Sequence, residues 1–422
     1  EVEILTLEDC LRIGIDNNLS LEGKRKEIQK SKYGVSENRS KLLPQITVIA
    51  GYNNNFDPPV SVTDGSSYGV PYNITQTLQH TANAGLEMQM PLFNQTLYTS
   101  MSIAKVMEEI SRLSYGKARE DIIMQISKMY YLGQVTAEQI VLIKANITRL
   151  EELRDITQAF FDNGMSMEVD LKRVNINLEN LKVQYDNAQA MMKQQLNMLK
   201  YIMDYPAEKE FVLTPVNTDS ITTVALTGLS ENIYELQLSQ SQVQLAEKQK
   251  KIISNGYIPS LSLTGSWRYA AYTDKGYHWF HSGPSNHWFR SYGLGLTLRI
   301  PIFDGLDKTY KIKKAMIDIE NRKLAWENAR KSLQTQYLNA VNDLMNNQRN
   351  FKKQKDNYLL AEDVYTVTSD RYREGIASMT EVLQDEMQMS EAQNNYISAH
   401  YNYRITNLML LKLTGQIESL VK

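Results

Sequence analysis

Residues 86–94 read LEMQMPLFN and residues 296–304 read LTLRIPIFD, and this matched pair decides the fold. In both stretches apolar and polar residues alternate up to a proline, which is typical of a β-strand with one apolar face. A second matched pair, LPQITV at 43–48 and IPSLSL at 258–263, lies 215 residues apart. The chain therefore contains two tandem copies of one strand-bearing unit.

The alternating segments predict four strands, at about residues 44–56, 82–93, 259–270 and 291–303. We place the helix–strand junctions at the four prolines that flank these segments, Pro44, Pro91, Pro259 and Pro301. Each strand has one apolar and one polar face. If the strands cross a membrane, the residues expected to face lipid include Leu86, Met88, Leu294 and Leu296.

Very long helices are predicted between the strands. Residues 96–161 and 306–373 contain no proline, and at 1.5 Å per residue each would run about 100 Å. Their apolar residues recur at intervals of seven, as in a coiled coil: Tyr337, Leu344, Phe351, Tyr358, Tyr365 and Tyr372. Second long helices are expected at about 165–203 and 376–414, after turns at Gly164 and Gly375.

Composition excludes several classes of function. Acidic and basic residues number 48 and 46, so the charge distribution does not favour nucleic-acid binding. The single cysteine, Cys10, lies in an amphipathic pattern and is expected to be buried packing. We find no nucleophile with a base, no phosphate-binding loop and no metal motif, so no catalytic residues, no metal site and no cofactor are predicted.

A membrane location would require oligomerisation. Four strands leave two unpaired edges, which are untenable in lipid, whereas three chains would supply twelve strands. Three of the four tryptophans fall among the aromatic residues between Trp267 and Tyr292, as expected at a membrane interface. The alternative is a soluble coiled-coil scaffold or interaction protein whose hairpins pack these aromatic residues on the helices.

The sequence resembles the TolC-type outer-membrane efflux family over nearly its whole length. The residues that carry the resemblance are Leu5-Thr6-Leu7-Glu8-Asp9 with Asn17-Asn18, Met90-Pro91-Leu92-Phe93, Ile300-Pro301-Ile302-Phe303-Asp304-Gly305, both turn glycines, and Leu410-Leu411-Lys412-Leu413-Thr414-Gly415. The resemblance implies a mainly α protein with a membrane β-barrel: a homotrimer with a twelve-stranded barrel continued by an α-helical tunnel. Residues 1–210 and 229–415 would be the two repeats, residues 204–228 a link in a belt around the tunnel, and residues 416–422 a tail.

The function implied by the resemblance is that of an exit duct in the outer membrane of a Gram-negative bacterium, with a long periplasmic extension. It would serve a tripartite efflux or type I secretion system, and its partners would be a periplasmic adaptor, an inner-membrane pump and outer-membrane lipid.

The resemblance also suggests site residues at the turn end of the helical hairpins. Acidic residues six positions after the turn glycines, Asp170 and Glu381, match gate positions, whereas Gln384 and Ala377 replace a second gate acid and a base of the family. Glu381, Gln384 and Gln388 lie on one polar face suited to a lumen. The adaptor contacts would be the hairpin tips, with Asp170 beside them: Asn163, Gly164, Met165, Ser166, Gly375, Ile376, Ala377 and Ser378. The alternatives are plain solvated turns and acids that favour a helix N-terminus.

Overall fold

The computed structural model describes residues 3–58, 60–64, 66, 69, 73–76, 78–215, 228–273 and 287–421. The chain forms two compact units. One, the helical unit, comprises Glu1–Ile28, Ile110–Gln240 and Lys323–Lys422, and the other, the sheet unit, comprises Gln29–Glu109 and Ser241–Arg322. Each unit takes segments from both halves of the chain, so the repeats in the sequence are not the compact bodies of the fold.

The predicted long helices are present. They are α3 (Gln95–Asp162), of 68 residues, and α6 (Asp307–Arg373), of 67 residues. Each is followed by a return helix, α4 (Glu168–Met203) or α7 (Met379–Leu413). The remaining helices are α1 (Leu7–Asn17), α2 (Leu19–Ser40) and α5 (Tyr234–Ser254), with short 3₁₀ turns at Asn255–Tyr257 (η2) and Ile417–Val421 (η3). Within the described ranges, no helix has both the length and the apolar character needed to cross a bilayer.

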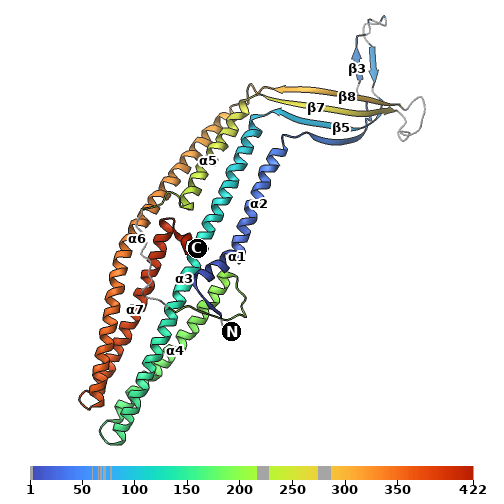
Figure 1. The fold of residues 1–422 in the computed structure, drawn as a ribbon. Helices are drawn as coiled ribbons and strands as arrows, with labels where there is room; N and C mark the ends of the chain where they lie inside the picture. Colours follow the sequence, from blue (N-terminus) through green and yellow to red (C-terminus); the bar gives the residue numbers. More distant parts are fainter. Residues whose placement is uncertain are drawn as a thin grey trace. The chain divides into compact units, whose positions relative to one another are not determined.

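Four strands form one antiparallel sheet in the sheet unit (Figure 1). They are β2 (Gln45–Asn54), β5 (His80–Phe93), β7 (Ser260–Thr273) and β8 (His287–Arg299), in the order β2-β5-β7-β8. The strand pair of the first repeat, β2 and β5, therefore lies beside the strand pair of the second, β7 and β8. Strands β2 and β8 form the two edges of the sheet.

The structure differs from the prediction at Pro301 and at Pro91. Strand β8 ends at Arg299, ahead of Pro301, because proline has no N–H to donate to the ladder. Pro91 lies inside β5 and not at a helix–strand junction, opposite Ser262 of β7. It is tolerated because β2 pairs with β5 only as far as Gln89, so that side of β5 is an edge at Pro91.

Two short strand pairs were not predicted. In the helical unit, β1 (Glu3–Leu5) pairs in parallel with β6 (Phe211–Leu213), which lies in the predicted link. In the sheet unit, β3 (Val60–Thr63) pairs with β4 (Asn73–Gln76) in a separate hairpin. Residues 216–227 of the link lie outside the described residues.

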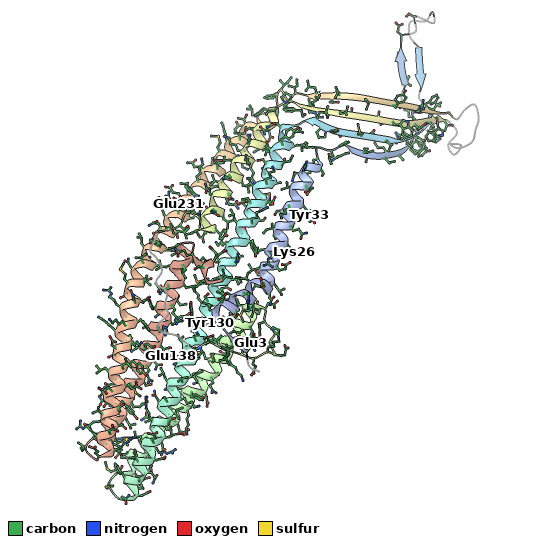
Figure 2. All side chains as sticks on the ribbon, in the orientation of Figure 1. Glu3, Lys26, Tyr33, Tyr130, Glu138 and Glu231 are labelled. Carbon is green, nitrogen blue, oxygen red and sulfur yellow. The ribbon has the colours of Figure 1, made fainter. Side chains whose placement is uncertain are left out.

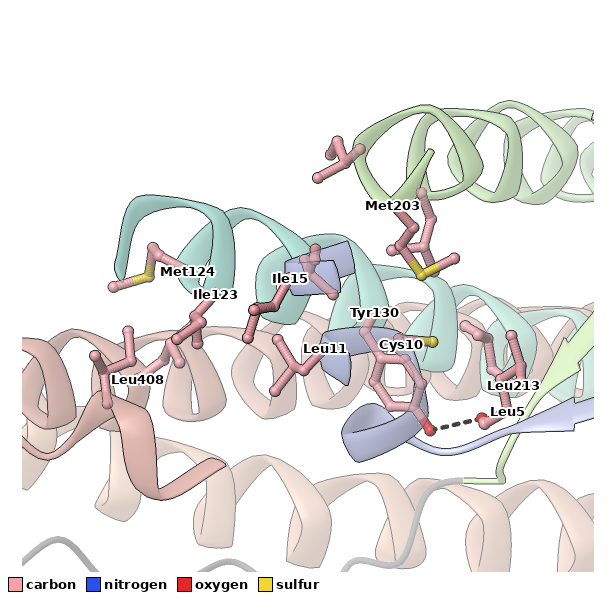
Figure 3. Close-up of a cluster of buried hydrophobic side chains, with 14 of the residues drawn as sticks. Leu5, Cys10, Leu11, Ile15, Ile123, Met124, Tyr130, Met203, Leu213 and Leu408 are labelled. Atoms are coloured by element: carbon pink, nitrogen blue, oxygen red, sulfur yellow. Dashed lines mark hydrogen bonds between the residues drawn. The ribbon is translucent and has the colours of Figure 1, made fainter. Parts of the chain in front are cut away.

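The main core of the helical unit surrounds α1 (Figure 3). Cys10 and Leu11 of α1 are fully buried against Ile123 of α3 and Met203 of α4, and the Tyr130 hydroxyl donates a hydrogen bond to the Leu5 carbonyl oxygen at 3.3 Å. Burial raises the pKa of the Cys10 thiol to about 12, so the side chain behaves as an apolar packing group. Ile417 of η3 joins this core, so the C-terminal tail is packed and not free.

Candidate functional site

The central sheet has one apolar face that is largely exposed. Residues directly opposite each other in a sheet share a face, and Leu86 lies between Val48 and Trp267 while Met88 lies between Ile46 and Gly265. The same pairing places Leu294 opposite Gly265 and Leu296 opposite Leu263. Leu294 and Leu296 are 80% and 68% exposed, so the four residues predicted to face lipid lie together on a surface that the chain itself leaves largely uncovered.

The opposite face of the same sheet is polar. Glu87 of β5 forms an ion pair with Arg268 of β7, and the space above them is lined by Thr47, Gln89, Thr264 and Ser266, among others. Thr297 lies opposite Ser262 on this face. Alternation therefore gives the sheet two chemically distinct surfaces, as a membrane barrel wall requires.

Aromatic side chains gather on the apolar face towards the end of the sheet at which β5 and β8 begin. Tyr292 pairs with Trp267, Trp288 pairs with Ala271, and Trp267 and Tyr269 pack edge-to-face at 5.6 Å between ring centroids. The predicted aromatic cluster is present in this part. Two members, Tyr272 and Phe289, lie on the opposite face, where their ring centroids are 6.2 Å apart. Tyr277, Trp279 and Phe280 lie outside the described residues.

The two long-helix turns have the same hydrogen-bond pattern, 211 residues apart. Gly164 has φ of +72° and its N–H donates to the Phe161 carbonyl oxygen, while the Met165 N–H donates to that of Phe160. In the second turn, Gly375 has φ of +74° and its N–H donates to the Tyr372 carbonyl oxygen, while the Ile376 N–H donates to the Arg371 carbonyl oxygen. This is the Schellman arrangement, and a positive φ explains each glycine.

Each turn exposes an apolar side chain. Met165 is 67% exposed and Ile376 is 62% exposed. The other predicted tip residues belong to the same two turns: Asn163, Ser166, Ala377 and Ser378. Of these, Asn163 binds the helix end, because its side-chain amide donates to the Ala159 carbonyl oxygen at 2.7 Å.

Glu381 closes the N-terminus of α7. Its carboxylate accepts a hydrogen bond from the Ser378 backbone N–H at 2.8 Å, and its own N–H donates to the Ser378 hydroxyl at 3.3 Å. The hydrogen bonds that the carboxylate accepts from the backbone N–H and the hydroxyl of Ser378 hold the pKa of Glu381 below its usual value. The matching Asp170 has no such partner, because Met167 stands in the place of Ser378, and it pairs instead with Arg173 at 3.3 Å.

A polar stripe continues from Glu381 along α7. Gln384 and Gln388 are exposed, whereas Val382 and Met389 are fully buried, as the seven-residue spacing predicts. Gln384 also lines an open groove between α4 and α7 with Arg173, Ile176 and Met387. The stripe therefore faces away from the protein core of this chain.

A buried carboxylate on α7 was not predicted. Glu386 is only 4% exposed, close to the apolar cluster of Val382, Leu383 and Met389, and burial raises its pKa to about 6. Its Oε1 atom has no hydrogen-bond partner among the described residues.

Several polar contacts hold the α6–α7 hairpin against the α3–α4 hairpin in this region. Arg149 of α3 forms an ion pair with Glu362 of α6, and Arg373 of α6 lies 3.3 Å from Glu152 of α3. The Thr157 and Tyr372 hydroxyls are 3.3 Å apart, and Arg173 of α4 donates to Thr380 of α7 at 3.4 Å. Farther along α3, Glu138, labelled in Figure 2, accepts a hydrogen bond from Tyr396 of α7. The hairpin ends are thus joined by a cluster of eleven buried apolar side chains from α3, α4, α6 and α7, with these polar contacts around it.

Comparison with known proteins identifies the family. The sequence pattern of outer membrane efflux proteins matches residues 13–203 and 217–416. The chain belongs to the outer membrane efflux protein family. It is similar to the outer membrane protein TolC of Vibrio cholerae, with 21% identity over 396 residues that cover 91% of this chain and 84% of that protein. It is also similar to TtgC of Pseudomonas putida, a probable efflux pump outer membrane protein, with 24% identity over 85% of this chain and 75% of that protein.

Solved structures agree on the fold of this efflux protein. The open state of the Neisseria gonorrhoeae MtrE outer membrane channel superposes with a TM-score of 0.76 at 18% identity, covering 97% of this chain and 88% of that one. The chain is therefore an outer-membrane efflux channel of a Gram-negative bacterium and not an enzyme. Its candidate functional site is a set of surfaces: the two faces of the sheet, the two hairpin tips and the polar stripe of α7.

Proposed function

We propose that three copies of this efflux protein close one twelve-stranded barrel in the outer membrane and extend their helical hairpins as a tunnel into the periplasm. The observation that carries the proposal is the open sheet: among the described residues, the edge strands β2 and β8 each have a strand partner on one side only, and the sheet has an exposed apolar face. An open edge in lipid leaves backbone N–H and C=O groups without partners, at a cost of several kcal/mol for each group.

Strand direction and barrel size support closure between copies. The four strands alternate in direction, so β8 of one copy would meet β2 of the next in the antiparallel sense that the rest of the sheet uses. Two copies would give eight strands, whose interior is filled by side chains. Three copies give twelve strands and room for a lumen lined by the polar face with Glu87 and Arg268, and the family resemblance favours this number.

The hairpin tips are the proposed contact with a periplasmic adaptor, which would link the channel to an inner-membrane pump. Exposed Met165 and Ile376 support this role, because neither side chain is needed for the turn that carries it. TtgC is named as an efflux pump protein, which agrees with a tripartite assembly. Asn163, Gly164, Ser166, Asp170, Gly375, Ala377 and Ser378 would complete the two contact surfaces.

The polar stripe of α7 is the proposed lining of the periplasmic gate. In a trimer, Glu381 would form a ring of three carboxylates, and Gln384 and Gln388 would continue the polar wall. Gln384 stands where the family resemblance implies a second gate acid, so the trimer would have one ring of carboxylates and not two. Polar contacts such as Thr157–Tyr372 and Arg373–Glu152 would hold this gate closed within each copy.

The native mass in detergent tests the assembly. One chain has a mass of 48.5 kDa, so the proposed assembly has a mass of about 145 kDa. A stable detergent-dependent trimer supports the proposal. A monomer that remains soluble without detergent would support the soluble scaffold instead.

A further inference from the structure

One guanidinium group lies on the otherwise uncharged apolar face of the sheet. Arg290 of β8 is paired with Tyr269 of β7 and stands between Trp288 and Tyr292 along its own strand. Because strand residues alternate between faces, Arg290 shares the face of Leu294 and Leu296. Its guanidinium carbon is 5.7 Å from the ring centroid of Tyr292, in cation–π contact.

The strands supply no carboxylate to this face. The positions that point the same way on β2 and β5 are Ile46, Val48, Ala50, Tyr52 and Asn54, and His80, Ala82, Ala84, Leu86, Met88 and Met90. The only acidic residue of the four strands, Glu87, is on the opposite face with Arg268. Closure of β8 against β2 of a neighbouring copy would also bring no acid to Arg290, because β2 contains neither Asp nor Glu.

The position of Arg290 along β8 corresponds to the boundary between the membrane and the water outside the cell. Eight residues separate it from Leu298, which for a tilted strand is about 20 Å along the membrane normal. The aliphatic residues Leu294, Leu296 and Leu298 fill that interval, and the aromatic residues surround Arg290 itself. Since the long helices follow the other end of the strands, this end of the sheet is the outer one.

We propose that Arg290 and its aromatic neighbours form a binding site for the phosphate headgroup of an acidic lipid in the outer leaflet. The inference rests on the proposed barrel, in which this face meets lipid. A guanidinium binds phosphate oxygens through two parallel N–H donors, and Trp288 and Tyr292 offer flat surfaces to the first carbons of the acyl chains. The lipid phosphate supplies the counter-charge that the strands of the protein do not.

Native mass spectrometry of the detergent-solubilised channel can test this site. The probes are bis-phosphorylated lipid A, phosphatidylglycerol, phosphatidylcholine and inorganic phosphate, added at equal concentrations. The test variant is Arg290→Gln, and the matched control is Arg299→Gln, on the same strand but on the polar face. Retention of lipid A should fall roughly tenfold or more in Arg290→Gln and stay unchanged in Arg299→Gln, because a charged hydrogen-bonding group is lost only in the first.

Each other result has a defined meaning. Equal retention of lipid A by Arg290→Gln and wild type would overturn the phosphate site. An equal loss of phosphatidylcholine, which carries a phosphate but no net charge, would overturn the assignment to an acidic lipid. Displacement of lipid A by inorganic phosphate at the same concentration would show a free-anion site and overturn the lipid assignment. The same spectra report the trimer: an intact trimer that keeps lipid A in Arg290→Gln contradicts this inference alone, whereas a wild-type monomer contradicts the proposed barrel as well.

Discussion

Ser378 and Glu381 cap the first turn of α7 reciprocally, each side chain accepting the backbone N–H of the other. The same carboxylate is the proposed charge of the periplasmic gate. One residue therefore has two separable properties, a hydrogen-bonding role that stabilises the helix end and a negative charge.

Substitution at Glu381 can separate these properties. Glutamine retains the capping-box hydrogen bond and removes the charge, whereas alanine removes both. We expect Glu381→Gln and Glu381→Ala to lose cation preference to the same extent in planar bilayers, since three like charges leave the lumen in each trimer. Only Glu381→Ala should lower the unfolding temperature, because it alone removes the capping-box hydrogen bond. Unchanged selectivity in both variants would leave Glu381 as a helix cap alone.

The two faces of the sheet should respond differently to a charge. Leu296→Arg places a guanidinium on the proposed lipid face and should oppose assembly in the membrane by about 2–4 kcal/mol if the residue lies near the bilayer midplane. Thr297→Arg, one residue further along β8, places it on the polar face opposite Ser262 and should assemble normally. Heat-modifiable migration of membrane extracts on gels measures assembly. The reverse pattern would invert the face assignment.

Glu386 should make stability depend on pH. Burial raises its folded-state pKa from 4.5 to about 6, so the folded chain binds this proton more tightly than the unfolded chain does. The fold is therefore stabilised as the pH falls from about 6 to 4.5, and at neutral pH the ionised carboxylate costs about 2 kcal/mol.

The matched variant is Glu386→Gln, which keeps the shape and removes the charge. It should unfold at a higher temperature than wild type at pH 7.5, and the difference should vanish near pH 4.5, as measured by loss of helical circular dichroism. A constant difference across this range would mean that the pKa of Glu386 is the same in the folded and unfolded chains, and would contradict the effect of burial.

The hairpin tips should matter for transport more than for the channel itself. Met165→Ser combined with Ile376→Ser should raise several-fold the accumulation of a fluorescent dye that wild-type cells of the native host export, and leave single-channel conductance unchanged. The two residues take part in the turns through their backbone N–H groups, which serine retains. Val141→Ser is the control, since Val141 on α3 is as exposed as Met165 but distant in sequence from both turns. Normal export of this dye by the tip variant would remove these two residues from the adaptor contact.

Much of the fold could be predicted because its signals are local and duplicated. Strand alternation around Leu86 and Leu296 and the proline-free stretches before Gly164 and Gly375 each need only neighbouring residues to be read. The pairing of β1 with β6 was not predictable, because it joins Leu5 to Leu213 across most of a repeat. Strands β3 and β4 have four residues each, too few for alternation to be distinctive.

Two functional features depend on packing and register. Val382 and Met389 define one buried line of residues along α7, at seven-residue spacing. Glu386 lies outside that line and is nevertheless buried, because α7 is covered on more than one side. The cross-strand neighbour of Arg290 follows from the register that pairs it with Tyr269, which the aromatic composition of 267–292 does not specify. The Ser378–Glu381 capping box, by contrast, was readable from the Ser-x-x-Glu spacing.

Disulfide cross-linking between the edge strands tests the central claim, barrel closure between copies, most directly. Val48→Cys on β2 is combined in turn with Tyr292→Cys, Leu294→Cys, Leu296→Cys or Leu298→Cys on β8, all on the apolar face. Val48→Cys with Leu86→Cys is the control, because these residues are direct partners within one chain. Cys10 is buried and need not be replaced. We predict that at least one β2–β8 pair gives a covalent trimer on denaturing gels of oxidised outer membranes. Monomers from all four pairs, with the control pair oxidised, would contradict the account.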